Sequence, residues 1–128
     1  AISKELSKKH RKYIEKIIGK PLQVSAKQWI NFSRLTFVHK TQKERLTIDI
    51  NLSFENEKES GDLRDIVIAE VKQERISRKS DFIRIAKEMS ILPMRLSKYC
   101  ISTMQLWQNI KQNRFKKKQL FINKLKKV

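Results

Sequence analysis

The chain has 128 residues, of which 39% are apolar, and a formal net charge of +17. This length holds one domain with a modest core, and the chain has no apolar run near 18 residues, which excludes a membrane-spanning helix. A single cysteine excludes an internal disulfide, and the N-terminus has no signal-peptide pattern, so we expect a cytoplasmic protein.

The first half of the chain predicts a helix followed by a β-hairpin. In residues 3–18 apolar side chains recur at helical spacing after the potential cap Ser3, and this amphipathic helix needs a surface to cover. Residues 28–38 are rich in aromatic and β-branched side chains, which is typical of a strand. Residues 44–54 alternate between polar and apolar and predict its hairpin partner.

The second half predicts one more strand and two helices. The charged residues 55–65 predict an exposed loop, and residues 66–74 a third strand. Ser80 caps a predicted helix that ends before Pro93, and a last helix carries Ile101 and continues, frayed, into the lysine-rich tail. Three strands between helices predict an α+β fold, with an antiparallel sheet and flanking amphipathic helices.

The alternation in residues 44–54 divides the second strand into two rows. The even positions from Leu46 to Phe54 are all apolar, and the odd positions from Arg45 to Ser53 are all polar. We expect helices to cover the apolar row. The polar row then faces either water or an enclosed polar cavity.

Charged residues in the predicted strands form the candidate site. Glu70 and Lys72 share one face of the third strand, roughly 6.6 Å apart. They form either a salt bridge on a solvated face or a polyanion site, in which the carboxylate holds a divalent cation and the ammonium binds phosphate oxygens. Arg34 and Arg45 on the other two strands favour phosphate, because the guanidinium donates parallel hydrogen bonds and keeps its charge.

Four segments in this order and spacing resemble a known family: FSRLTF at 32–37, ERLTID at 44–49, IAEVK at 68–72 and RLSKYC at 95–100. They are similar to the C-terminal half of the vacuolar transporter chaperone (VTC) domain, the polyphosphate polymerase module of the triphosphate tunnel metalloenzyme (CYTH-like) superfamily. The resemblance implies half of a tunnel-like β-barrel within a single domain. Its parts are an N-terminal helix at 1–20, the VTC-like core at 22–106 and a basic helix or tail at 107–128.

The resemblance also implies roles for individual residues. The implied phosphate-binding residues are Arg34, Arg45, Lys72, Arg95, Ser97 and Lys98. Glu70 matches the family's metal-binding glutamate, and the implied cofactor is manganese or magnesium. In the family this machinery transfers the γ-phosphoryl group of ATP to a polyphosphate chain, a metal-dependent reaction that relies on positioning and electrostatic neutralisation. The expected ligand is ATP, another triphosphate or polyphosphate.

Two departures from the family pattern limit what we expect of this chain alone. Phe32 stands where the family has tyrosine, and the family's N-terminal half has no counterpart before residue 22. Half a tunnel cannot close, so we expect the chain to be inactive as a polymerase unless the missing half or a second chain completes it.

The basic ends of the chain support an alternative function. Residues 1–20 contain seven Lys or Arg and two acidic residues, and residues 107–128 contain eight and none. Such ends are usually solvated helix faces, but they also suit a non-catalytic module that binds nucleic acid or an anionic membrane surface.

Overall fold

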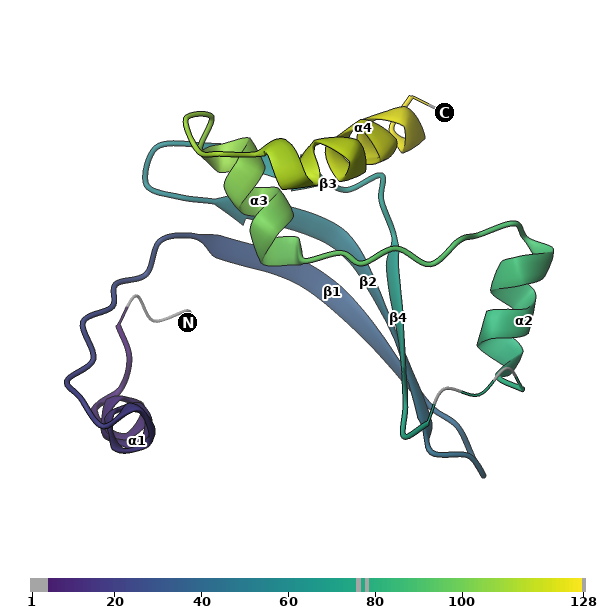
Figure 1. Cartoon of the computed structure of the whole chain (residues 1–128), viewed down its shortest axis with the longest axis horizontal. Helices are drawn as coiled ribbons and strands as arrows, with labels where there is room; N and C mark the ends of the chain where they lie inside the picture. Colours follow the sequence, from purple (N-terminus) through teal and green to yellow (C-terminus); the bar gives the residue numbers. More distant parts are fainter. Residues whose placement is uncertain (1–4, 76, 78, 128) are drawn as a thin grey trace.

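The computed structural model describes residues 5–75, 77 and 79–127, which form an α+β fold as predicted (Figure 1). In this part of the chain an open antiparallel sheet of four strands is accompanied by four α-helices. The elements are α1 (Lys8–Ile18), β1 (Trp29–Val38), β2 (Glu44–Glu55), β3 (Ser60–Leu63), β4 (Ile68–Gln73), α2 (Asp81–Glu88), α3 (Lys98–Leu106), the 3₁₀ turn η1 (Asn113–Phe115) and α4 (Lys116–Leu125).

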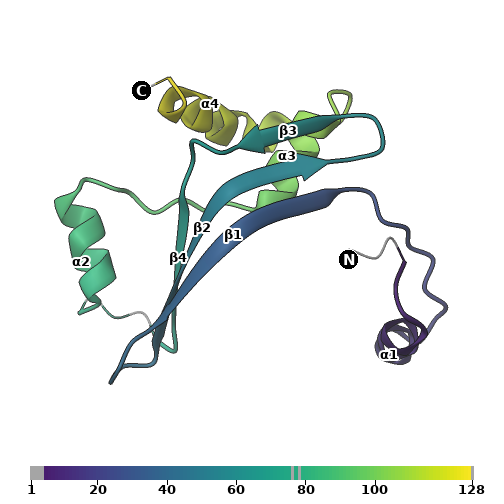
Figure 2. The ribbon, with the colours of Figure 1, turned by 180° about the vertical axis from the view of Figure 1, so that it is seen from behind.

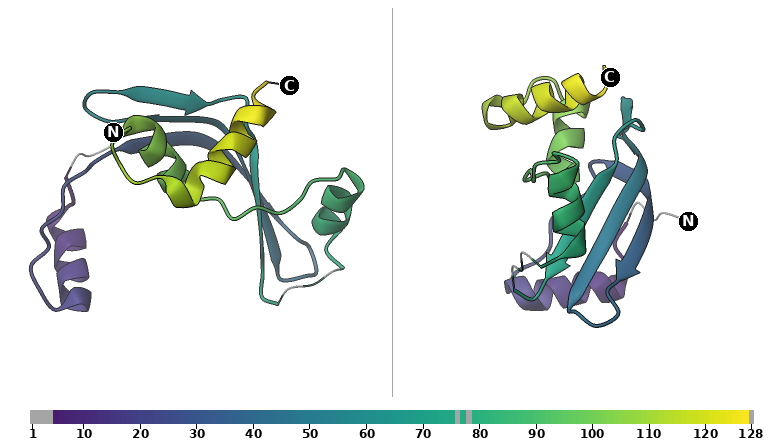
Figure 3. Two further views of the ribbon diagram at one scale, coloured as in Figure 1. Left: turned by 45° about the horizontal axis from the view of Figure 1, so that its top comes forward. Right: turned by 90° about the vertical axis from the view of Figure 1, so that its right-hand side faces the viewer.

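The long strand β2 forms the centre of the sheet. One edge of β2 pairs with β1, and the other pairs with β4 along its first half and with β3 along its last residues. All three pairings are antiparallel. The sheet is strongly curved, and α3 and α4 lie on one side of it (Figure 3).

The prediction of an exposed loop at residues 55–65 is wrong at Ser60–Leu63, which form the strand β3. Leu63 at its end is fully buried, and Gly61 lies opposite Phe54 of β2. A Cβ atom at position 61 would lie 2.6 Å from Cε2 of that phenylalanine. The glycine is therefore needed for close approach of a ring, whereas the sequence pattern suggested the flexibility of a loop.

A bulge at Asn51 reverses the alternation of β2. Asn51 has a φ of 55°, and the register passes from the pair Ser33–Ile50 to the pair Asn31–Ser53, so β2 contains one extra residue. Beyond the bulge the apolar even positions lie on the face that Asp49 occupies before it. The prediction of a single apolar row through residue 54 is therefore wrong.

The core lies on this shared face, at the end of the sheet near β3. Its buried side chains come from β2, β3, α3 and α4: Leu52, Phe54, Leu63, Ile101, Met104, Leu106 and Ile122. The helices thus cover the face that carries the polar row, and not the apolar row of Leu46, Ile48 and Ile50 as expected. Figure 2 shows the sheet from the opposite side. The register places Leu35 and Phe37 of β1 on this opposite face, where they remain about half exposed.

The helix boundaries follow from local capping. The Ser7 hydroxyl accepts a hydrogen bond from the His10 amide and starts α1, whereas the predicted cap Ser3 lies outside the described residues. Ser80 caps α2 as predicted, through the amide of Ile83. No residue of α1 is buried, so the surface that this helix needs is not supplied by the described part of the chain.

The C-terminal region contains two helices, where the sequence predicted one continuous helix. α3 ends at Leu106, and α4 begins after the turn η1. Between them the side-chain amide of Gln112 donates to the carbonyl groups of Met104 and Trp107. These bonds satisfy carbonyls that the end of α3 leaves free and redirect the chain. None of the helices in the described residues has the length and apolar content needed to cross a membrane.

Candidate functional site

A buried carboxylate, Asp49 of β2, joins two cations. Arg34 Nε and Nη2 donate to its two oxygens at 2.6 and 2.8 Å, and Lys98 Nζ lies 2.6 Å from Oδ2. The Asp49 side chain is 1% exposed, while those of Arg34 and Lys98 are 41% and 18% exposed. Burial of this charge is tolerable because both oxygens are paired.

The local structure explains why these three side chains meet. The register of the hairpin places Arg34 directly opposite Asp49. Ser97 caps α3 by accepting from the Cys100 amide at 3.2 Å, so that Lys98 is the first helical residue and lies above the sheet. Asp49 was not among the predicted site residues. The sequence feature that could have revealed Asp49 is its position between two isoleucines. A carboxylate there needs a partner once the strand is buried.

The aromatic ring of Phe32 contacts the same two cations. The Arg34 guanidinium carbon lies 5.1 Å and Lys98 Nζ 5.2 Å from the centre of the Phe32 ring. Contacts of this kind stabilise a cation by about 0.5–1 kcal/mol at partly exposed sites. The ring therefore helps to orient Arg34 and Lys98.

A second group of charges lies further along the same face. Arg45 of β2 is opposite Lys72 of β4, and Thr47 is opposite Glu70, so these side chains share one face. Lys72 Nζ lies 3.4 Å from Glu70 Oε1, and both side chains are about half exposed. Arg45 is four residues from Asp49, which separates the two groups by roughly 13 Å along the strand.

We call this set the basic face: Arg34, Arg45, Lys72, Lys98, Asp49 and Glu70. Its four cations exceed its two carboxylates, so an excess of positive charge remains. Thr36 and Thr47 are paired in the register between the two groups and add hydroxyl groups to the middle of the face. At its far end, Arg45 and Lys72 line a shallow depression beside the hairpin turn.

The ion pairs of the basic face shift two pKa values. The hydrogen bond from Arg34, helped by Lys98 and opposed by desolvation, lowers the pKa of Asp49 from 3.8 to about 2. The same hydrogen bond raises the pKa of Arg34, and attraction from Asp49 and Glu70 adds to this effect. Both groups therefore stay charged throughout the neutral range.

The remaining predicted site residues are placed less directly. Arg95 is exposed in the segment before α3 and makes no ion pair with any residue that the structure describes. The Ser97 hydroxyl serves as the cap of α3. The structure thus brings five of the seven predicted residues onto one face and leaves Arg95 and Ser97 beside it, at the start of the helix.

The donors suit a divalent cation that arrives with phosphate groups. The described residues contain no cluster of three or more His, Cys, Asp or Glu side chains that could hold a metal alone. Both oxygens of Asp49 are engaged, whereas the half-exposed Glu70 is paired only through one oxygen with Lys72. Magnesium is commonly bound by one or two carboxylates together with substrate phosphates, so Glu70 fits this mode.

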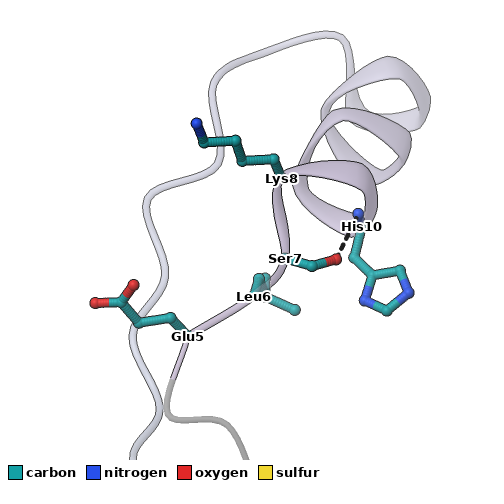
Figure 4. A pocket seen from close by; sticks show the side chains of 5 residues that line it. All are labelled: Glu5, Leu6, Ser7, Lys8 and His10. Carbon is teal, nitrogen blue, oxygen red and sulfur yellow. Dashed lines mark hydrogen bonds between the residues drawn. The ribbon is translucent and has the colours of Figure 1, made fainter.

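A second depression lies beside the start of α1 (Figure 4). It is lined by Glu5, Leu6, Ser7, Lys8 and His10, and Figure 4 shows the Ser7 hydroxyl bonded to the His10 amide. Its lining residues are all neighbours in sequence around a helix cap. It therefore does not bring together chemistry from separate parts of the fold, as the basic face does.

Comparison with known proteins gives one match. The family model described as VTC domain matches residues 2–107, which include α1, the whole sheet, α2 and α3. Every residue of the basic face lies within this range, and α4 lies outside it. No curated protein and no solved structure matches the chain.

Proposed function

The chain belongs to the VTC domain family, and we propose that its basic face binds the phosphate groups of a triphosphate or a polyphosphate. The observation that carries this proposal is the convergence of four cations from β1, β2, β4 and α3 on one side of the sheet. Asp49 and Glu70 neutralise only part of this charge. A chain of phosphates could contact both groups of cations, which are roughly 13 Å apart along β2.

Arg34 and Lys98 keep free donors for this ligand. The guanidinium group has five N–H donors, of which two are used by Asp49, and the ammonium group has three, of which one faces the same carboxylate. Asp49 and the Phe32 ring hold both groups in place, so little further ordering is needed when phosphate binds. Arg45 and Lys72 would contact the phosphates at the other end of the face.

Glu70 would hold a manganese or magnesium ion between the two groups of cations. The ion supplies charge neutralisation for the phosphates, which lowers their mutual repulsion. To bind it, Glu70 would exchange its 3.4 Å contact with Lys72 for the metal. Lys72 would then turn to phosphate oxygens, so that carboxylate and ammonium both contribute to ligand binding.

We propose binding for this chain alone, and polyphosphate polymerisation only for an assembly that encloses the ligand. A charge pair 4 Å apart is worth about 1 kcal/mol in bulk water and about 4 kcal/mol at an effective dielectric of 20. The sheet is open, and the side chains of Lys72 and Glu70 are about half exposed. Further strands, from outside these residues or from a second chain, would exclude water and complete a tunnel of the kind that the resemblance implies.

The C-terminal region supports a second candidate function. Residues 107–128 carry eight cations and no acidic residue, and α4 presents part of this charge. A non-catalytic module that binds nucleic acid or an anionic surface through this region would show steep salt dependence. It would lose affinity when residues 111–128 are removed, and mutation of the basic face would have little effect.

Calorimetric titration with tripolyphosphate at near-physiological salt, with and without manganese, separates the two functions. We expect Arg45→Ala to weaken binding roughly tenfold, because hydrogen bonds to charged groups contribute about 1.5–3 kcal/mol. Arg84→Ala is the matched control, because it removes the same charge from an exposed position on α2. Glu70→Gln should abolish the enhancement by manganese and leave metal-free binding intact.

Single-stranded DNA serves as the competing ligand in the same titration. Preference for tripolyphosphate that increases with manganese supports the proposal. If Arg45→Ala and Arg84→Ala bind alike, or if DNA competes equally and salt removes both interactions, the affinity comes from the basic ends and the proposal is wrong.

A further inference from the structure

Helix α1 exposes a largely apolar side. The apolar residues of the helix fall within one side when placed at 100° per residue: Tyr13, Ile14, Ile17 and Ile18, with His10 among them. The side chains of Tyr13 and Ile17 are each 67% exposed, and no residue of the helix is buried. Figure 1 shows α1 beyond the beginning of β1, apart from the sheet and from the other helices.

The opposite side of α1 is strongly basic. It carries Lys8, Lys9, Arg11, Lys12 and Lys16, with Glu15 as its single acidic residue. Arg11 donates to the Leu22 carbonyl at 2.7 Å, and Glu15 accepts from the Leu22 amide at 2.9 Å. The chain that follows the helix therefore returns along the charged side and leaves the apolar side open.

A helix of this length needs a second surface to be stable. Isolated helices shorter than about 12–15 residues are marginal in water, and α1 has 11 residues. An apolar side opposite a lysine-rich side is the pattern of helices that lie in the plane of the membrane interface, where anionic lipid head groups attract the cations. Five cations against one carboxylate leave this side with a net positive charge, which complements a negatively charged surface.

We propose that α1 binds the surface of an anionic lipid bilayer and lies in its plane. The side chains of Tyr13 and Ile17 enter the boundary between head groups and acyl chains, and Lys9, Lys12 and Lys16 contact the head groups. This contact is independent of the basic face. It would hold the domain at a membrane surface without any spanning segment among the described residues.

Vesicle sedimentation with the full chain at physiological salt tests the proposal. The probes are vesicles of phosphatidylcholine alone and of phosphatidylcholine with phosphatidylserine. We expect binding only to the anionic vesicles. Ile17→Ser should lower the partition coefficient on the order of tenfold, because it removes an aliphatic group that enters the bilayer when α1 binds. The matched control is Leu120→Ser, at a position that is 56% exposed among the lysines of α4; it should bind like the wild type.

Several outcomes would overturn the proposal. These are equal binding to both kinds of vesicle, no binding to either, or unchanged binding by Ile17→Ser. Loss of binding by Leu120→Ser alone would assign the contact to α4. A dimer that dissociates on Ile17→Ser, with no vesicle binding, would show that a second copy covers α1. Because Ile17 is exposed, its replacement leaves the fold intact, and circular dichroism checks this.

Discussion

Replacement of Asp49 by asparagine should destabilise the protein and remove part of its acid sensitivity. The change keeps the shape of the side chain but removes the charge that Arg34 and Lys98 share. Asp49 is 1% exposed, so water cannot replace the lost interaction. The neutral amide also presents donors to two cations that can only donate, which leaves polar groups without good partners.

The pKa of Asp49 sets the size of the expected loss of stability. Folding lowers this pKa from 3.8 to about 2, which corresponds to roughly 2 kcal/mol of stability at neutral pH. Because the folded pKa is lower than the unfolded one, this stability is present above about pH 4. It is lost as the pH falls towards 2. The cost of leaving the asparagine amide without good partners adds to this loss. We therefore expect Asp49→Asn to lower the free energy of unfolding by about 2–3 kcal/mol at pH 7.

Urea unfolding followed by the fluorescence of Trp29 and Trp107 measures this difference at pH 7, 4 and 2. The wild type should exceed Asp49→Asn by about 2–3 kcal/mol at pH 7 and by well under 1 kcal/mol at pH 2. Glu88→Gln serves as the control, because it breaks an exposed pair with Arg84 and should cost less than about 0.5 kcal/mol. Equal stability of Asp49→Asn and wild type at pH 7, or a difference that does not change with pH, would refute the reasoning.

Two further changes test the contact between β3 and β2 and the bulge of β2 by the same urea unfolding. Gly61→Ala should cost about 1–3 kcal/mol, because its Cβ would meet the buried Phe54 ring at 2.6 Å; a neutral effect would show that the ring can move aside. Asn51→Val should cost about 1–2 kcal/mol, because a β-branched residue resists a φ of 55°, whereas Asn51→Gly should be tolerated. Similar stability of these two variants would contradict the bulge at this position.

Most strand positions could be predicted from the sequence because they depend on local pattern. Aromatic and β-branched residues located β1, strict alternation located β2, and an apolar run located β4 within two residues of its ends. β3 was missed because its sequence, SGDL, is too short and polar to carry a strand pattern. It forms a strand because Leu63 fills the core and Gly61 admits the Phe54 ring.

The sequence analysis named five of the six residues that the structure brings together on the basic face, but not Asp49, to which Arg34 and Lys98 are both bonded. Arg34, Arg45 and Glu70 are on one face, as the period of two implied. Asp49 was missed, because its importance depends on burial and on the arrival of Lys98 from a helix 49 residues later in the chain. No local pattern encodes that meeting. The register and the cap of α3 produce it together.

The sequence by itself determined the class of the fold and the order of its main elements, because propensity, alternation and motif spacing act over short stretches of chain. The tertiary structure alone decided which side of the sheet the helices cover. Without the bulge at Asn51, the apolar row of β2 would be continuous, and the helices would pack on the face away from Arg34. With it, Leu52 and Phe54 join the face of Asp49, so that the core and the basic face lie side by side under α3.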